Sequence, residues 1–190
     1  MERTRGKIEG EGNMAIQIGA RPDSGFDDPI GMLKDCHRRI ERFLHILWVV
    51  ANRAAGRALT DEEAAAVQSA LHYFRQGGQR HTADEEESLF PRLRAESAAG
   101  HFEELGGLES DHRQANSLHA VVETLYLAWI SIGLQSPEDE ERLLYAIEQL
   151  EHLYKGHIQV EEQVVFPHAA QMLDSGTIAA IGQEFRARRK

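Results

Sequence analysis

Two segments of the sequence repeat a pattern of residues that can bind metal ions. In each, a histidine is followed by glutamates four and five positions later and by Phe-Pro nine and ten positions later. The first copy covers residues 81–91 and the second covers residues 157–167. Upstream, the segments around His37 and His112 also match each other, at an offset of about 75 residues. Five identities at the same spacing indicate a duplicated unit rather than chance.

The spacing within each copy suits metal binding. Residues four apart on a helix share one face, so an imidazole and a carboxylate can reach the same ion, or the carboxylate can bridge two ions. Pairs of this kind that face the core of a helix bundle build di-iron and di-manganese sites. Two pairs and one histidine from each remaining helix give six ligands, three for each of two ions, with positions left open for a small molecule. The predicted ligands are His37, His81, Glu85, His112, His157 and Glu161.

A single His-x-x-x-Glu on a helix is usually a surface ion pair. Two copies in a repeat, each with an upstream histidine in matching register, favour metal binding instead. Six polar groups in one core layer would be unfavourable without an ion, since each uncompensated group costs about 1–3 kcal/mol.

Several other residues near this pattern have open roles. His119, two turns further along the third predicted helix, is a candidate for a buried core histidine or an additional ligand. Glu41, four residues after the first predicted histidine, is a candidate ligand, an acceptor that fixes an imidazole tautomer, or an ion-pair partner. Glu86 and Glu162 are turned by about 100° from the ligand face and are expected to be solvated.

Hydrophobic periodicity predicts helices and no strands. The first helix begins at the N-cap Asp28 with Pro29 and stops at Gly56, and the second begins at the capping box from Thr60 to Glu63. The fourth begins at Ser136-Pro137. A short last helix has the apolar face Ile178, Ile181 and Phe185. The third helix begins between residues 101 and 108 and ends near Ile132, and the fourth ends near Leu173. Within the second helix, Gly77-Gly78 costs roughly 2 kcal/mol relative to two alanines, which a kink or a close helix–helix approach would explain. Pro91 is expected to perturb the end of that helix.

Four long helices with short connections predict an all-α fold, an up-down-up-down four-helix bundle with a short extra C-terminal helix. In an antiparallel bundle, the starts of the odd helices lie beside the ends of the even ones. The four histidines of the pattern would therefore fall in one layer near one end of the bundle.

Composition narrows the classes of partner. The sequence is 42% hydrophobic and 27% charged, which is typical of a globular domain, and its formal net charge of −10 argues against nucleic acid. Neither a membrane span nor a secretory segment is expected. The single cysteine, Cys36, forms no internal disulfide and fits a cytoplasmic location. The basic tail that includes Arg188 and Arg189 suits a helix C-terminus, where the dipole favours cations.

Taken together, these residues and motifs resemble the hemerythrin-like family, also called the HHE cation-binding domain. The resemblance rests on the six predicted ligands and on the two Phe-Pro motifs, and it covers about residues 28–173. Residues 1–26 contain several glycines, little apolar periodicity and Pro22, and are predicted to form a flexible N-terminal arm. The resemblance implies a four-helix bundle domain over residues 27–190. It also implies a centre of two iron ions with an oxo or hydroxo bridge and bridging carboxylates, although zinc or manganese would accept the same ligands.

One departure from the oxygen-carrying members bears on function. Their third helix has two histidines four apart, whereas here Asn116 stands four residues after His112. The second carboxylate is Glu161 rather than an aspartate. The resemblance therefore favours the bacterial branch that senses oxygen, nitric oxide or iron. We expect a protein that binds or senses such a small diatomic ligand. The alternatives are a redox enzyme acting on peroxide or nitric oxide, and an iron-buffering or stress-response module.

Overall fold

The structure is a computed structural model that describes residues 23–96 and 103–190. Within these two ranges every regular element is a helix and there is no strand, which confirms the all-α prediction. The N-terminal arm predicted for residues 1–26 falls mostly on residues 1–22, which lie outside the described ranges. Across the part that is described, no helix has the length and apolar character needed to cross a membrane.

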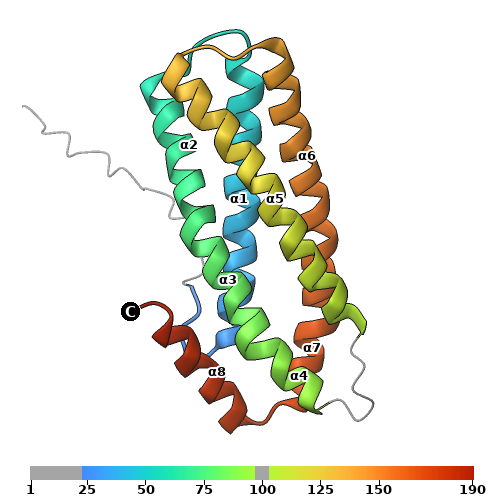
Figure 1. Ribbon diagram of the computed structural model, residues 1–190. Coiled ribbons are helices and arrows are strands. Elements are labelled where there is room, and N and C mark those ends of the chain that lie inside the picture. The colour runs from blue at the N-terminus through green and yellow to red at the C-terminus, as the bar shows by residue number, and fades with distance from the viewer. Residues whose placement is uncertain (1–22, 97–102) are drawn as a thin grey trace, which may run out of the picture.

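Within the described residues the helices line up as four long rods. The rods lie side by side, and successive rods run in opposite directions (Figure 1). The first rod covers residues 29–54 and the third covers residues 103–132, and each is a single helix. The second rod covers residues 61–96 and the fourth covers residues 137–172, and both are divided by π-helical segments. A shorter C-terminal helix follows the fourth rod. The α-helices are α1 Pro29–Ala54, α2 Asp61–Tyr73, α3 Gln79–Asp84, α4 Phe90–Glu96, α5 Glu103–Ile132, α6 Pro137–Val160, α7 Phe166–Met172 and α8 Ser175–Ala187. The π-helical segments are η1 Phe74–Gly78, η2 Glu85–Leu89 and η3 Glu161–Val165.

The predicted caps begin three of the rods. The side chain of Asp28 accepts a hydrogen bond from the backbone of Gly31 at the start of α1. Thr60 and Glu63 form a reciprocal capping box at the start of α2. The side chain of Ser136 accepts a hydrogen bond from the backbone N–H of Asp139 at the start of α6. These short polar side chains therefore set where the rods begin, and with them the register of the residues further along.

Two of the π-helical segments occupy equivalent positions in the repeat. They begin at Glu85 and Glu161, and in each the backbone N–H five residues later donates to the glutamate carbonyl. Pro91 and Pro167 then stand second in a new α-helical segment, where a missing N–H is tolerated. The helix does not end at Pro91, because the irregularity precedes the proline and α4 continues to Glu96. The Phe-Pro motif is thus the sequence signature of a bulge that starts on a predicted ligand.

The third π-helical segment, η1, contains the Gly77-Gly78 pair. A Cβ atom at Gly77 would lie 2.6 Å from the ring of Tyr73, so the ring packs directly over the glycine. The hydroxyl of Tyr73 donates to the carbonyl of Cys36 in α1, over 3.2 Å. Gly77 therefore makes room for the ring of Tyr73 in its own rod, and the Tyr73 hydroxyl joins that rod to α1.

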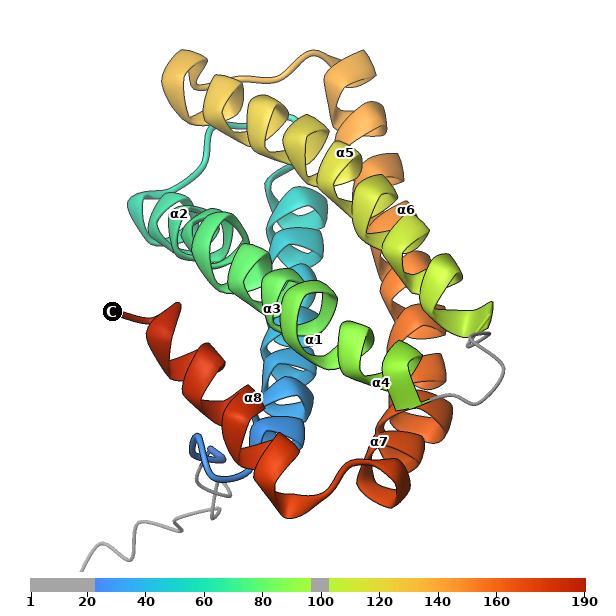
Figure 2. The same cartoon turned by 60° about the horizontal axis from the view of Figure 1, so that its bottom comes forward.

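The C-terminal helix α8 lies against the bundle near one of its ends and packs against α1, α3 and η2 (Figure 2). It also lies close to the segment that precedes α1, since a Cβ atom at Gly182 would lie 1.9 Å from the carbonyl oxygen of Phe26. The guanidinium of Arg186 lies over the Phe26 ring, 5.0 Å from its centre. The segment before α1 and the helix after the fourth rod therefore pack against each other.

Buried apolar side chains form two clusters along the bundle. One contains Leu47, Tyr126 and Trp129, and the other contains Phe90 and Phe166. In every rod the predicted ligands lie between a member of one cluster and a member of the other. The flanking pairs are Leu33 and Ile40 in the first rod, Phe74 and Leu89 in the second, Leu108 and Ala115 in the third, and Leu150 and Val165 in the fourth. A polar layer is thus enclosed between two apolar ones.

Candidate metal centre

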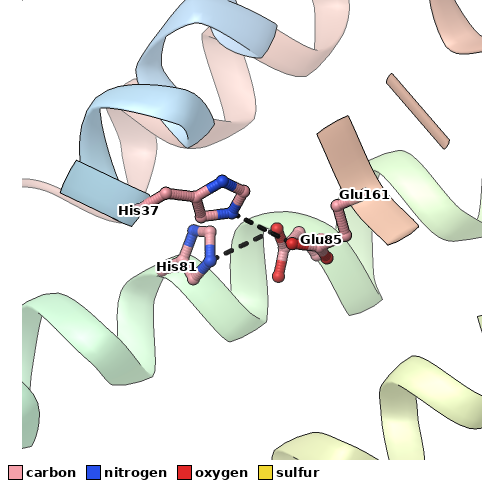
Figure 3. Close-up of side chains that lie close together, drawn as sticks. All are labelled: His37, His81, Glu85 and Glu161. Atoms are coloured by element: carbon pink, nitrogen blue, oxygen red, sulfur yellow. Dashed lines mark ion pairs between the residues drawn. The ribbon is translucent and has the colours of Figure 1, made fainter. Parts of the chain in front are cut away.

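Six buried side chains, supplied by all four rods, meet in this polar layer. Their nitrogen and oxygen atoms form two groups, and within each group these atoms lie within 4.8 Å of one another. His37 and His81 belong to one group, His112 and His157 belong to the other, and the same two glutamates belong to both. Figure 3 shows the first group, with the imidazoles from two rods pointing toward the carboxylates. These are the six residues predicted from the repeat, and no further residue of the described ranges joins either group.

Each glutamate faces one histidine of its own rod and one histidine of another. The oxygens of Glu85 lie 3.4 Å from Nε2 of His81 and 3.3 Å from Nε2 of His112. The oxygens of Glu161 approach the other two histidines in the same way, at 3.3 and 3.0 Å. Each group therefore has two nitrogen and two oxygen contributors, where the sequence predicted three ligands. The difference arises because both carboxylates are shared.

The atoms that face the centre are buried and lack hydrogen-bond partners. They include Nε2 of all four histidines and both oxygens of Glu85 and Glu161. The short contacts between them do not have hydrogen-bond geometry. A buried polar atom without a partner costs about 1–3 kcal/mol, so such a set is unfavourable unless another group satisfies it. Imidazole nitrogens and carboxylate oxygens that converge in this way fit divalent metal ions.

Electrostatics supports the same interpretation. Burial, followed by the charge of Glu161, raises the pKa of Glu85 well above its usual range. Burial also opposes ionisation of Glu161, but the flanking imidazoles outweigh it and hold the pKa of that carboxyl well below its usual range. Burial lowers the pKa of His81 and of His112, which keeps both imidazoles neutral. Burial opposes protonation of His157, but Glu161 and Asp111 outweigh it and raise the pKa of that imidazole. The neutral imidazoles of His81 and His112 and the uncompensated carboxyl of Glu85 are suited to bind cations.

Carboxylates on the outer side of the centre hold two of the imidazoles. Nδ1 of His37 lies 2.8 Å from Glu162, and Nδ1 of His112 lies 2.8 Å from Glu86. When Nδ1–H donates a hydrogen bond to a carboxylate, Nε2 carries no proton and is free to bind a metal ion. The prediction that Glu86 and Glu162 are solvated is incomplete, because their side chains are 35% and 38% exposed but each also reaches a histidine of another rod. The repeat contained the signal, since both copies carry a glutamate at the fifth position after the histidine.

The phenylalanines of the two Phe-Pro motifs pack against the same two histidines. Phe166 stacks on His37 with ring centres 5.6 Å apart, and Phe90 stacks near His112 with ring centres 6.4 Å apart. In both cases the phenylalanine and the outer glutamate come from the same rod. Each repeat copy therefore positions a histidine supplied by the other half of the chain.

The remaining two histidines differ in their outer contacts. Nδ1 of His157 lies 3.4 Å from a carboxylate oxygen of Asp111. Nδ1 of His81 is buried and has no hydrogen-bond partner among the described residues. The repeat explains the difference, because Cys36 stands where the second half has Asp111. The two halves of the centre are thus similar in their inner residues and unequal in their surroundings.

Other candidates from the sequence lie outside both groups. His119 is half-buried, and its Nε2 lies 3.0 Å from the hydroxyl of Tyr154. The Tyr154 ring in turn contacts His157, with ring centres 6.3 Å apart. His119 is therefore one residue removed from the centre rather than part of it. Glu41 is exposed and joins neither group.

We predict that the outer glutamates raise metal affinity. Glu162→Ala removes the acceptor that orients His37, and it should weaken metal binding by about 10- to 100-fold. Gln163→Ala, a change at an exposed position of the same segment, is the matched control and should leave affinity unchanged. Competition with a chelator would measure both variants. Equal affinities for the two would contradict the orienting role.

A second prediction concerns pH. Burial lowers the pKa of His119 to about 4, from an ordinary value of 6.5. Because the pKa is lower in the folded state, the stabilisation associated with neutral His119 is complete above pH 6.5 and is lost as pH falls toward 4. Over this interval the unfolding free energy of the metal-free protein should fall by up to about 3 kcal/mol more than that of His119→Gln.

Urea unfolding at a series of pH values would test this difference. His152→Gln changes an exposed histidine of α6 and should retain the wild-type pH dependence. If His119→Gln and the wild type lose stability in parallel, then His119 is not held neutral by burial.

Comparison with known proteins agrees with the residue pattern. The hemerythrin HHE cation-binding domain model matches residues 28–169, a range that contains all six converging residues. An uncharacterised protein of Haemophilus influenzae is 26% identical over 170 residues, which is 87% of this chain and 92% of that protein. The family resemblance drawn from the sequence is thereby confirmed. The chain belongs to the hemerythrin HHE cation-binding domain family.

Proposed function

We propose that this protein binds two metal ions, iron in its working form, and uses them to bind or sense dioxygen or a related small molecule such as nitric oxide. The observation that supports this most strongly is the sharing of Glu85 and Glu161 between two pairs of histidines. A site for one ion would need only one of the two groups. Two groups joined by two carboxylates are the arrangement that a pair of neighbouring ions requires.

In this proposal each ion would be held by two imidazole Nε2 atoms and one oxygen from each shared carboxylate. His37 and His81 would hold one ion, and His112 and His157 would hold the other. The up-down-up-down order of the rods would bring these residues into one layer. Mixed imidazole and carboxylate ligands suit iron, and they also accept manganese or zinc. Iron, when bound, would supply a change of oxidation state and open positions for a small molecule.

The surroundings of the centre favour a small, uncharged ligand. All six converging side chains are buried, and apolar clusters lie on both sides of them along the bundle. The stacked rings of Phe90 and Phe166 cover two of the imidazoles. These residues would restrict water around the centre, and a diatomic molecule could enter where a larger or charged substrate would not.

The test is to load the protein with Fe²⁺ under anaerobic conditions and to record metal content and optical spectra. Dioxygen, nitric oxide and hydrogen peroxide are then added in separate samples. Two ions per chain and a spectral change that reverses when the gas is removed would support binding or sensing. Continuous consumption of peroxide or nitric oxide would instead identify a redox enzyme. A loaded protein that responds to none of the three would indicate iron buffering. Failure to bind two ions would overturn the proposal.

A further inference from the structure

We infer that the C-terminal helix α8 positions Glu85 through Arg188 and Arg189, so that one of the two shared carboxylates is held by a clamp that the other lacks. We call these two arginines and their partners on the second rod the α8 clamp. The inference rests on the proposed function, because it assigns the clamp a role toward the bound ions.

The clamp closes on a buried carboxylate next to the centre. Asp84 is 0% exposed and directly precedes Glu85. Its two oxygens accept hydrogen bonds from Arg188 over 3.0 Å and from Arg189 over 2.5 Å. A charged carboxylate at this depth requires such partners, since an uncompensated buried charge is strongly destabilising. The position of Asp84 in the rod is therefore tied to the end of α8.

Arg188 also holds the π-helical segment that carries Glu85. Nη2 of Arg188 donates to the hydroxyl of Ser88 over 2.8 Å, and its Nε donates to Glu87 over 3.2 Å. Asp84 and Ser88 stand on either side of Glu85 in the chain. The clamp therefore fixes both ends of the segment from which the Glu85 carboxylate points to the centre.

A further ion pair extends the contact along the second rod. The guanidinium of Arg92 donates to both oxygens of Glu184 in α8, over 2.7 and 3.1 Å. A two-point pairing of this kind fixes orientation as well as distance. The α8 clamp is thus attached to the second rod on both sides of the bulge.

The repeat shows that these contacts are not needed to form the bulge itself. The positions equivalent to Asp84, Glu87, Ser88 and Arg92 are Val160, Gln163, Val164 and His168. The fourth rod forms the same π-helical segment at Glu161 without an acidic or hydroxyl side chain at the first and third of these positions. The inner ligands are alike in the two copies, whereas the residues that contact α8 are not. The ionic contacts therefore have a role beyond building the local backbone.

The need to attach α8 to the bundle does not account for these ionic contacts either. The helix already buries Ile181 and Phe185 and packs closely at Gly182. An apolar contact would attach a helix at least as well as a buried ion pair, because burial of charges offsets much of their attraction. Charged hydrogen bonds have fixed directions, so they can define the position of the neighbouring residue in a way that an apolar contact cannot. Here that neighbour is Glu85, whose carboxylate is common to both ligand groups.

The clamp lies on the rod whose converging histidine has no outer hydrogen-bond partner among the described residues. Asp111 orients His157 on one side, and no described residue pairs with Nδ1 of His81 on the other. Loosening Glu85 should therefore weaken the hold on both ions, with the larger effect on the ion bound by His37 and His81.

The test compares two double variants of the same tail. Arg188→Ala with Arg189→Ala removes the clamp. Arg186→Ala with Lys190→Ala is the matched control, because it removes two positive charges and the contact of Arg186 with the Phe26 ring but leaves every contact of the clamp in place. Each protein is titrated with Fe²⁺ under anaerobic conditions against a chelator. We expect about 10-fold weaker binding and a changed optical spectrum of the loaded protein in the clamp variant, and wild-type behaviour in the control.

The metal-induced rise in melting temperature separates a positioning role from a structural one. A clamp that only attaches α8 would lower the melting temperatures of the metal-free and loaded proteins equally, and that result would overturn the inference. If the clamp positions Glu85, then its removal would lower the melting temperature of the loaded protein more than that of the metal-free protein, because the affinity for the ions falls. Arg188→Lys with Arg189→Lys should recover part of the affinity, since a lysine keeps the charge but not the paired geometry.

If the clamp variant does not fold, then Asp84→Asn replaces it, because this change keeps the size of the side chain and removes its charge. Weaker Fe²⁺ binding in Asp84→Asn supports the inference, and unchanged binding overturns it. A wild-type protein that fails to bind two ions refutes the proposed function instead. A wild type that binds two ions while every variant binds them equally well refutes only the role of the clamp.

Discussion

Replacing Glu85 with alanine is expected to abolish tight binding of both metal ions, whereas replacing His81 with alanine should abolish binding of one. The carboxylate of Glu85 contributes to both ligand groups, while the imidazole of His81 contributes to one. The loss of a shared ligand should exceed the roughly 100-fold loss of affinity that removal of an outer partner can cause. Metal content after dialysis, together with chelator competition, would measure the stoichiometry of each variant.

Glu41→Ala serves as the control for this comparison. Glu41 stands four residues after His37, as Glu85 stands four residues after His81, but it is exposed and outside both groups. Its replacement should leave two ions bound at wild-type affinity. A Glu85→Ala variant that keeps one ion as tightly as the wild type would show that the carboxylate serves a single ion.

Removal of the metal ions should cause the largest change in stability. A ligand at about 100 times its dissociation constant stabilises the folded state by roughly 2.7 kcal/mol, so two ions would contribute roughly 5 kcal/mol. For a domain of this length each kcal/mol shifts the melting temperature by about 2–4 °C. Chelation should therefore lower the melting temperature by roughly 10–20 °C, as measured by calorimetry or circular dichroism.

A variant with alanine at both Glu85 and Glu161 provides the reference for that experiment. It lacks the shared ligands, and chelator should leave its melting temperature unchanged. A wild-type protein whose melting temperature does not respond to metal or to chelator would show that the buried polar layer is stable without ions. That outcome would also remove the main energetic argument for a metal centre.

The inner residues of the centre were predictable because local spacing and the repeat determine them. A residue and its fourth neighbour share a helix face whatever the tertiary structure, so His81 with Glu85 could be identified from the chain alone. The family resemblance was available on the same residues, and the helix caps followed from short polar side chains at Asp28 and Thr60.

The outer contacts were not predictable by the same argument, because they join residues far apart in the sequence. Glu162 reaches His37 over a separation of 125 positions, and Arg188 reaches Asp84 over 104 positions. Helix periodicity places Glu162 about 100° away from the ligand face, which suggests solvent, although that direction leads to the neighbouring rod. The second glutamate of each copy was a usable signal, since the repeat retained it. Nothing comparable marked the arginines of the tail.

The π-helical segments show a similar limit. A helical pattern continues through residues 85–89 with little change, and Pro91 suggested a disturbance at the wrong place. The bulge lies before the proline and begins on the ligand itself. Bulges of this kind are frequent at functional sites, where they turn a side chain relative to its regular direction. Here two of the π-helical segments begin on the two glutamates that both ligand groups share.

The central claim is that two ions share the carboxylates of Glu85 and Glu161, and anomalous X-ray diffraction from crystals of the iron-loaded protein tests it most directly. The account predicts two iron peaks in the buried layer, one beside His37 and His81 and one beside His112 and His157, with both glutamates between them. A single peak, or peaks bound by other residues, would contradict it.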